Sequence, residues 1–352
     1  MNRLWRPGPT TLLATTQAGR NLTLASTAWM LSGLTPSPLI NGLLPAFGTL
    51  PLLLQVRRDP KGYGLQLMAV LLLIAISLGG NLMTLDRMIP LVGCFAAMLL
   101  LGLGKEISTL PLQRHLLSNT GLTMPKLRSG QDLGALIGNL LAALLLPGLR
   151  QFLPALLLLL PMTRVAAASR NIPETTSPSP PTKRLPLDSN CMLQGLVMGA
   201  LFALLALWVR EVDGGKCFDF AMVLAAYGLG RTGMSLLPDM HRSVRYLLIG
   251  ALLLISQTSL PSVVAVLLFV PMGALAAASD AALVEQLSPL GDAPLRWQVL
   301  LRSSAVGGVA GSVGLGLICQ LFSLTVALPL VIAGCLLLAI TASHMTPSNQ
   351  QP

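Results

Sequence analysis

A few ionisable side chains interrupt long apolar segments of the sequence. Lys105 and Glu106 lie near the end of one such segment, Arg231 lies within a second, and Asp280 lies within a third. A charge inside hydrocarbon costs at least a few kcal/mol and needs an opposite charge or water beside it. Residues of this kind are typical of ion pathways or of charge networks between helices, and they are the first candidates for function.

The signatures of common enzymes and metal sites are missing from the sequence. It contains no His-Glu-x-x-His, no Gly-x-Ser-x-Gly and no phosphate-binding Gly-x-x-x-x-Gly-Lys-Ser/Thr loop. Its five cysteines are dispersed and lie mostly in apolar stretches, where they serve as small hydrophobic residues. We therefore expect no enzyme, no metal centre and no cofactor.

The composition is that of a membrane protein. Of 352 residues, 53% are hydrophobic and 10% are charged, and the mean hydropathy is +0.72. This leaves too little polar surface for a soluble protein of this size. Because a bilayer core needs about 20 apolar residues per helix, we predict an all-α polytopic membrane protein with about twelve transmembrane helices. The predicted spans are 18–36, 38–56, 64–84, 89–108, 131–149, 150–168, 191–210, 218–237, 244–259, 261–284, 299–319 and 321–342.

The boundary between the fifth and sixth predicted spans rests on Pro147-Gly148 and Pro154 as helix breakers. Ten or eleven helices therefore remain alternatives to twelve. A Pro/Ser-rich polar linker, 171–187, divides the chain into an N-terminal six-helix half, 1–170, and a C-terminal six-helix half, 188–352.

Basic residues predict the orientation, because Lys and Arg accumulate in cytoplasmic loops. With the N-terminus inside, most of the 23 basic residues fall on inner segments, including the lead-in Met1–Arg20, so both termini and the linker are expected in the cytoplasm. A bacterial inner membrane is the expected location. The net charge of +10 then reflects topology and attraction to anionic lipid, and nucleic-acid binding is not expected. The outer segments hold only Arg87, Arg150, Arg210 and Lys216.

The two halves resemble each other in sequence. At one offset of about half the chain length, Leu127-Arg128-Ser129 falls on Leu301-Arg302-Ser303 and Glu106 falls on Asp280. This register predicts a duplicated six-helix unit, a common way for transporters to build a central site.

Small residues recur at every fourth position in two corresponding spans. One stripe contains Gly130, Gly134 and Gly138, and the other contains Gly308 with Gly311 beside it. Such a stripe makes a flat helix face that lets a neighbouring backbone approach closely. The stripes are interpreted as tight packing, or as faces that slide when the halves move.

Six helices, a cytoplasmic linker and six further helices resemble the plan of the major facilitator superfamily over nearly the whole chain. The loop Asp239-Met240-His241-Arg242-Ser243-Val244-Arg245 is similar to the inter-helix signature of that superfamily, whereas 57–62 departs further from it. The run 43–51 and the Gly-rich span led by Arg302 are similar to the branch of siderophore and macrolide exporters. The Gly-Pro pair of the antiporter signature is missing, and 352 residues is short for this superfamily.

The resemblance implies a substrate path between the halves, lined mainly by spans 1, 4, 7 and 10. Glu106 and Asp280 then have two main interpretations. As buried carboxyl groups they would exchange protons while their surroundings alternate between wet and dry. As parts of an inner gate they would pair with basic residues in a network that opens and shuts. The third alternative is snorkelling to the interface. The basic candidates for this gate are Lys105, Arg128, Arg231 and Arg302.

Two further charged positions receive structural interpretations. Asp132 is predicted to be an N-terminal helix charge that faces the helix dipole. The segment from Arg210 to Lys216 is predicted to be a solvated outer turn.

The leading function is a secondary active transporter of a small amphipathic or hydrophobic molecule, working by alternating access and as a proton-coupled exporter. Its partners would be that substrate and membrane lipid, and the oligomeric state stays open. The alternative is a superfamily relative that no longer transports and acts as a membrane assembly factor or as a pigment- or lipid-binding factor.

Overall fold

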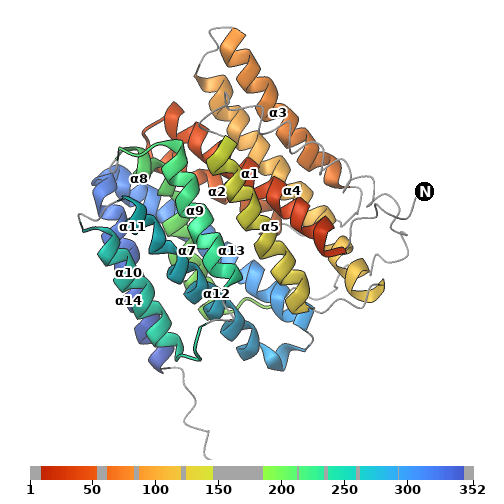
Figure 1. Cartoon of the computed structure of the whole chain (residues 1–352), viewed down its shortest axis with the longest axis vertical. Coiled ribbons are helices and arrows are strands. Elements are labelled where there is room, and N and C mark those ends of the chain that lie inside the picture. Colours follow the sequence, from red (N-terminus) through yellow and green to blue (C-terminus); the bar gives the residue numbers. More distant parts are fainter. Residues whose placement is uncertain are drawn as a thin grey trace, which may run out of the picture.

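The computed structural model describes residues 9–53, 62–82, 87–119, 124–145, 185–211, 214–233, 237–258, 262–291 and 293–344. Every regular element in these ranges is a helix, and the helices pack side by side in a single bundle (Figure 1). The all-α prediction is confirmed. Predicted span 150–168 and most of the predicted linker 171–187 lie outside the described residues. The count of twelve spans and the three domain boundaries therefore stay predictions.

Two helices of the N-terminal half begin with proline, whose missing N–H is no loss in a first turn. α1 begins well before the predicted residue 18, so part of the predicted lead-in is helical and Arg20 lies in the middle of a helix. α5 likewise begins before the predicted residue 131, and α4 continues beyond the predicted residue 108. The described helices of this half are α1 Pro9–Leu34, α2 Pro38–Leu53, α3 Tyr63–Leu82, α4 Met88–Asn119 and α5 Met124–Leu145.

Two predicted spans of the C-terminal half are each broken into two helices. α7 ends before Leu204, and α11 ends before Leu268. The second break lies just before Pro271, which has no N–H to donate to the carbonyl of Leu267. The described helices are α7 Ser189–Ala203, α8 Leu205–Glu211, α9 Cys217–Thr232, α10 Arg242–Ser256, α11 Ser262–Leu267, α12 Phe269–Gln286, α13 Ala293–Leu321 and α14 Ala327–His344, with short 3₁₀ helices at Ser288–Leu290 and Leu324–Val326.

Helix length and composition agree with a membrane environment. Large apolar side chains face outward, and Phe322 is 75% exposed and Val263 is 68% exposed. In water such a surface would be costly, whereas lipid solvates it. The chain is an integral membrane protein. The described segments long and apolar enough to span a bilayer are Met88–Ser108, Ser189–Glu211, Val263–Gln286, Ala293–Leu321 and Leu324–Ser343.

The packing order of the first half recurs in the second half. α1 packs against α5 as α7 packs against α13, and α2 packs against α4 as α9 packs against α12. Across the two halves, α2 contacts α13 and α5 contacts α9, which are again corresponding pairs. This arrangement agrees with the predicted duplication.

The small-residue stripes lie at the predicted close contacts between helices. A Cβ atom on Gly134 or Gly138 would overlap the backbone of Ala14 or Ala18 on α1. Gly130 is different, because a Cβ there would lie 3.4 Å from the nearest atom of α1, which is an ordinary contact. Two of the three glycines of the first stripe are therefore required for the close contact between α1 and α5.

The second stripe makes the corresponding contact between α13 and α7. A Cβ on Gly311 would overlap the backbone of Leu196, and Gly308 lies opposite Gly199. Gly314, on the same helix, faces open space, because a Cβ atom added there would have no neighbouring atom within 4 Å.

We predict that Gly134→Ala lowers the stability of the protein by roughly 1–3 kcal/mol, because the new methyl group must push α1 away from α5. Gly314→Ala is the matched control, since it brings the same gain in helix propensity without a clash. The midpoint of thermal unfolding of the purified protein in detergent measures the effect. Equal midpoints for the two variants would contradict the close contact.

Candidate functional site

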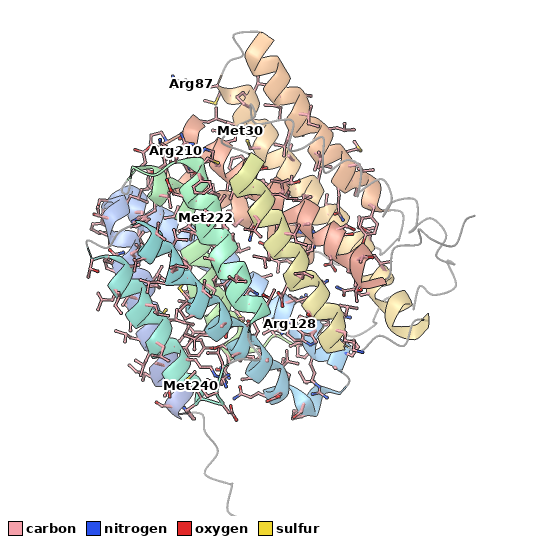
Figure 2. All side chains as sticks on the ribbon, in the orientation of Figure 1. Met30, Arg87, Arg128, Arg210, Met222 and Met240 are labelled. Atoms are coloured by element: carbon pink, nitrogen blue, oxygen red, sulfur yellow. The ribbon has the colours of Figure 1, made fainter. Side chains whose placement is uncertain are left out.

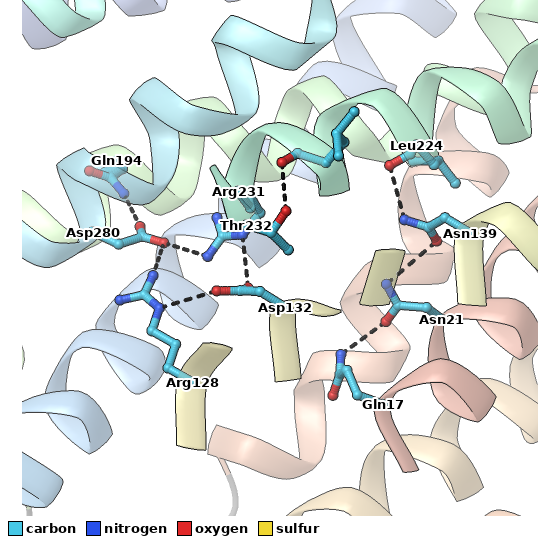
Figure 3. Close-up of polar contacts among 11 residues, drawn as sticks. Gln17, Asn21, Arg128, Asp132, Asn139, Gln194, Leu224, Arg231, Thr232 and Asp280 are labelled. Carbon is cyan, nitrogen blue, oxygen red and sulfur yellow. Dashed lines mark hydrogen bonds and ion pairs between the residues drawn. The ribbon is translucent and has the colours of Figure 1, made fainter. Parts of the chain in front are cut away.

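Four charged side chains form a closed ring where α5, α9 and α12 meet (Figure 3). The ring consists of Arg128, Asp132, Arg231 and Asp280, whose side chains are 17–22% exposed. Positive and negative groups alternate around it. Partial burial strengthens each attraction relative to the protein surface, and alternation leaves no like charges as direct partners.

Asp280 accepts three hydrogen bonds. Its Oδ2 accepts from the Nη2 atoms of Arg128 and Arg231, both at 3.0 Å. Its Oδ1 accepts from Nε2 of Gln194 on α7 at 2.5 Å. Asp280 is thus the side chain on which helices of both halves converge.

Asp132 closes the opposite side of the ring. Nε of Arg231 donates to its Oδ1 at 3.3 Å, and Nε of Arg128 lies 3.7 Å from its Oδ2. Each guanidinium therefore offers Nε to one carboxylate and Nη2 to the other, a use of the planar fork that a lysine cannot reproduce.

The ring connects the two halves of the chain. Arg128 and Asp132 are four residues apart on α5 in the N-terminal half, whereas Arg231 and Asp280 belong to α9 and α12 in the C-terminal half. Each half thus contributes one positive and one negative group. Opening the ring between the halves would break Arg128–Asp280 and Arg231–Asp132.

Uncharged side chains around the ring hold Asp280 and Arg128 in place. Oε1 of Gln194 accepts a hydrogen bond from the hydroxyl of Tyr246 at 2.5 Å, and Tyr246 is fully buried. The guanidinium of Arg128 stacks over the ring of Trp297 with its Cζ 3.9 Å from the centroid. These contacts hold Asp280 and Arg128 in one orientation, as a supporting layer does in many functional sites.

A second contact between the halves lies toward the other end of the bundle, where Figure 2 labels Arg210. Arg210 of α8 donates through Nε to Oγ of Ser32 and through Nη2 to the carbonyl of Trp29, both at 3.1 Å. Its guanidinium also stacks over Trp29, with Cζ 4.1 Å from the ring centroid. The prediction of a solvated turn was therefore wrong for Arg210, which crosses to α1.

Figure 3 also shows a row of amide side chains beside the charged ring. Nε2 of Gln17 donates to Oδ1 of Asn21 at 2.9 Å, and Nδ2 of Asn21 lies 3.5 Å from Oδ1 of Asn139. Nδ2 of Asn139 then donates to the carbonyl of Leu224 at 3.0 Å. The row runs from α1 through α5 to α9, so it also crosses between the halves.

The structure brings together three of the six predicted gate or coupling residues, namely Arg128, Arg231 and Asp280. Glu106 and Lys105 lie on α4, where Glu106 is buried at 7% exposure. Arg302 lies on α13, with its Nη1 3.5 Å from the carbonyl of Leu185. None of these three is a member of the four-residue ring.

Asp132 does not have the predicted role at a helix N-terminus. Because α5 begins at Met124, Asp132 lies beyond the first two turns of the helix and faces Arg231. Its spacing of four residues from Arg128 is the signal that could have revealed the pair, since such residues are neighbours on a helix. Gln194 and the amide row carry no charge, so a search for charged residues in apolar segments missed them.

No family model and no curated protein matches the sequence. Solved structures, in contrast, match nearly the whole chain. The nucleoside transporter NupG is 10% identical, with a TM-score of 0.62, and the match covers 96% of this chain and 99% of NupG. A D-xylose-proton symporter is 12% identical, with a TM-score of 0.64 and coverage of 97% of both chains. The chain has the major facilitator fold.

Another structure with this fold is a bacterial homologue of the human lysosomal transporter Spinster, captured in an inward-facing and occupied conformation. It is 13% identical, with a TM-score of 0.60, and the match covers 95% of this chain and 91% of the homologue. The major facilitator fold is thus shown by structural similarity, although the sequence identity is low. The similarity to its exporter branch stays a prediction.

We predict that Asp280→Ala destabilises the protein by about 2 kcal/mol, because it leaves two partly buried guanidinium groups without their shared carboxylate. Glu285→Ala on the same helix is the control, since Glu285 is exposed. Thermal unfolding of both purified variants tests this. An equal loss in the two variants would contradict a structural role for the ring.

Proposed function

We propose that the protein is a secondary transporter that moves a small molecule across the membrane by alternating access. One observation carries the proposal: the charged ring closes the interface between the halves with two ion pairs. A carrier needs contacts that hold one end of its path shut and that can break and reform. The Arg210–Trp29 contact, toward the other end, is the counterpart that such a cycle requires.

In this proposal the ring is the inner gate, and Asp280 is its control point. Protonation of Asp280 would neutralise the carboxylate that two guanidinium groups share. Arg128 and Arg231 would then share only Asp132, and the net positive charge of these three groups favours separation of the halves. Gate opening and proton binding are thereby coupled in one side chain.

The proposed location, topology and substrate type rest on the composition and on the distribution of basic residues between inner and outer segments. We propose a location in a bacterial inner membrane with both termini in the cytoplasm, and proton-coupled export of an amphipathic or hydrophobic substrate. A path with few charged groups suits such a molecule better than it suits a multiply charged metabolite. Solved proteins of the same fold are described as transporters of nucleosides, of D-xylose with protons, and of organic anions.

Transport is tested by energised accumulation of a panel of lipophilic cations, weak acids and siderophore-like compounds in an efflux-deficient bacterial host. The wild type should change the accumulation of at least one compound. Asp280→Asn should reduce that flux about tenfold or more at matched membrane expression, because the amide cannot exchange a proton or pair fully with two guanidinium groups.

Glu285→Gln is the matched control for the flux assay, because it removes an exposed carboxylate from the same helix. The control should transport like the wild type. Absence of any flux by the well-expressed wild type would refute the transport proposal. It would favour the assembly factor, which predicts a partner that copurifies.

Alternating access also predicts that the contact made by Arg210 opens during the cycle. Ser32 is 2% exposed, so a cysteine at this position should react slowly with a membrane-impermeant maleimide while the contact is closed. Adding Arg210→Ala to Ser32→Cys should accelerate labelling severalfold. Adding Arg296→Ala should not, because Arg296 is a half-buried arginine whose described hydrogen bond is to the carbonyl of Gly291 and not to Ser32. The parent protein with Ser32 gives the background from native cysteines. A labelling rate that Arg210→Ala leaves unchanged would contradict this gate.

A further inference from the structure

One face of α1 combines amide groups with an apolar side chain. Gln17, Asn21 and Leu24 are spaced four and three residues apart, which places them on the same side of the helix. Gln17 and Asn21 are half-buried, and Leu24 is 38% exposed. Asn21 approaches Asn139 of α5, which reaches α9, so this face is directed toward the interface between the halves.

The amide row keeps hydrogen-bonding capacity in reserve. An asparagine side chain offers two N–H donors and two carbonyl lone pairs. In the contacts described above, Asn139 uses one donor on Leu224 and one lone pair toward Asn21. The Asn21–Asn139 distance of 3.5 Å exceeds the usual range for a hydrogen bond of this kind. This pair is the weakest connection of the row, and separating it costs little.

We propose that Gln17, Asn21 and Asn139 bind the neutral polar head group of the transported molecule, with its apolar part lying along Leu24. The head group would carry both a donor and an acceptor, as an amide, a urea or a hydroxyl group does. It would enter between Asn21 and Asn139 and replace their long contact with two shorter ones. This inference rests on the proposed transport function and specifies its substrate class.

The charges around the row favour a neutral head group. Arg20 lies one residue from Asn21, but it is 5% exposed and its Nη1 already donates to Oε1 of Gln17 at 2.9 Å. The row itself contains no carboxylate that could neutralise a cationic head group. Asp132 and Asp280 are engaged by two arginines in the ring. A cationic ligand would thus lose its hydration without gaining an opposite charge at the row. An anionic ligand could pair with Arg20 only by displacing Gln17 from a guanidinium that is almost fully buried.

The row also connects ligand binding to the interface. Asn139 of the N-terminal half donates to a main-chain carbonyl of the C-terminal half. A ligand that recruits Asn139 competes for the side chain that makes this connection. Binding would therefore weaken a contact between the halves at the point where the substrate sits, in addition to the contacts at the two ends.

The test compares three probes of equal chain length, namely octanamide, octanoate and octylammonium, on the purified full-length protein in lipid nanodiscs. Binding is measured as the shift in thermal unfolding across a concentration series. Octanamide should stabilise the wild type, and the two charged probes should not. Asn21→Leu and Asn139→Leu should bind octanamide about tenfold more weakly, because each removes hydrogen bonds at nearly constant side-chain volume.

Gln286→Leu is the control variant, since it removes an exposed amide outside the row. It should bind octanamide like the wild type. Asn21→Leu changes a half-buried position and serves as the second test if Asn139→Leu fails to fold. The inference is overturned if octanamide does not stabilise the wild type, if the charged probes bind equally well, or if both leucine variants retain wild-type affinity.

Binding and flux separate the two proposals. Octanamide binding by a protein that transports no compound would contradict the transport function while leaving the head-group site standing. Flux with unchanged compound preference in Asn21→Leu and Asn139→Leu would contradict the head-group site alone.

Discussion

Mutual neutralisation of charge at the interface between the halves is the constraint on which the rest of the arrangement depends. The two arginine and two aspartate side chains are largely buried, so each must be held by groups of opposite sign. This requirement fixes the relative positions of α5, α9 and α12. The supporting contacts of Gln194 and Trp297 then follow, because they keep the hydrogen-bonding atoms of Asp280 and Arg128 in register.

The helical architecture could be predicted from sequence because a helix that crosses lipid must be apolar and about 20 residues long. The helical class and the internal repeat both follow from apolar segments and from matching registers such as Leu127-Arg128-Ser129 with Leu301-Arg302-Ser303. Helix starts were predicted less well at α1 and α5. Their first turns contain polar or basic residues, which hydropathy assigns to loops although they belong to helices that pack against each other.

The candidate site was predictable only in part, for the same physical reason. Arg231 and Asp280 stand out as charges in apolar sequence, but their partner Asp132 lies in a polar segment whose helical start was misplaced. Uncharged amides such as Asn139 disturb hydropathy little, and their importance depends on which helix they face. Contacts between distant segments, such as Arg210 with Trp29, follow from the packing of the two halves and leave no local signature.

The composition of the ring has an electrical consequence. If the halves separate while Asp280 is ionised, Arg128 keeps Asp132 on the same helix, and Arg231 keeps Asp280 within its own half. Each half therefore takes one positive and one negative group of the ring with it, and these charges cancel. No net charge from the ring crosses the membrane field. The membrane potential, which does about 2.3 kcal/mol of work per elementary charge for each 100 mV, therefore does almost no work on this movement. Separation of the ring is thus electroneutral while both aspartates are ionised, and in the proposed transport cycle voltage would act on this gate only through a proton bound to Asp280.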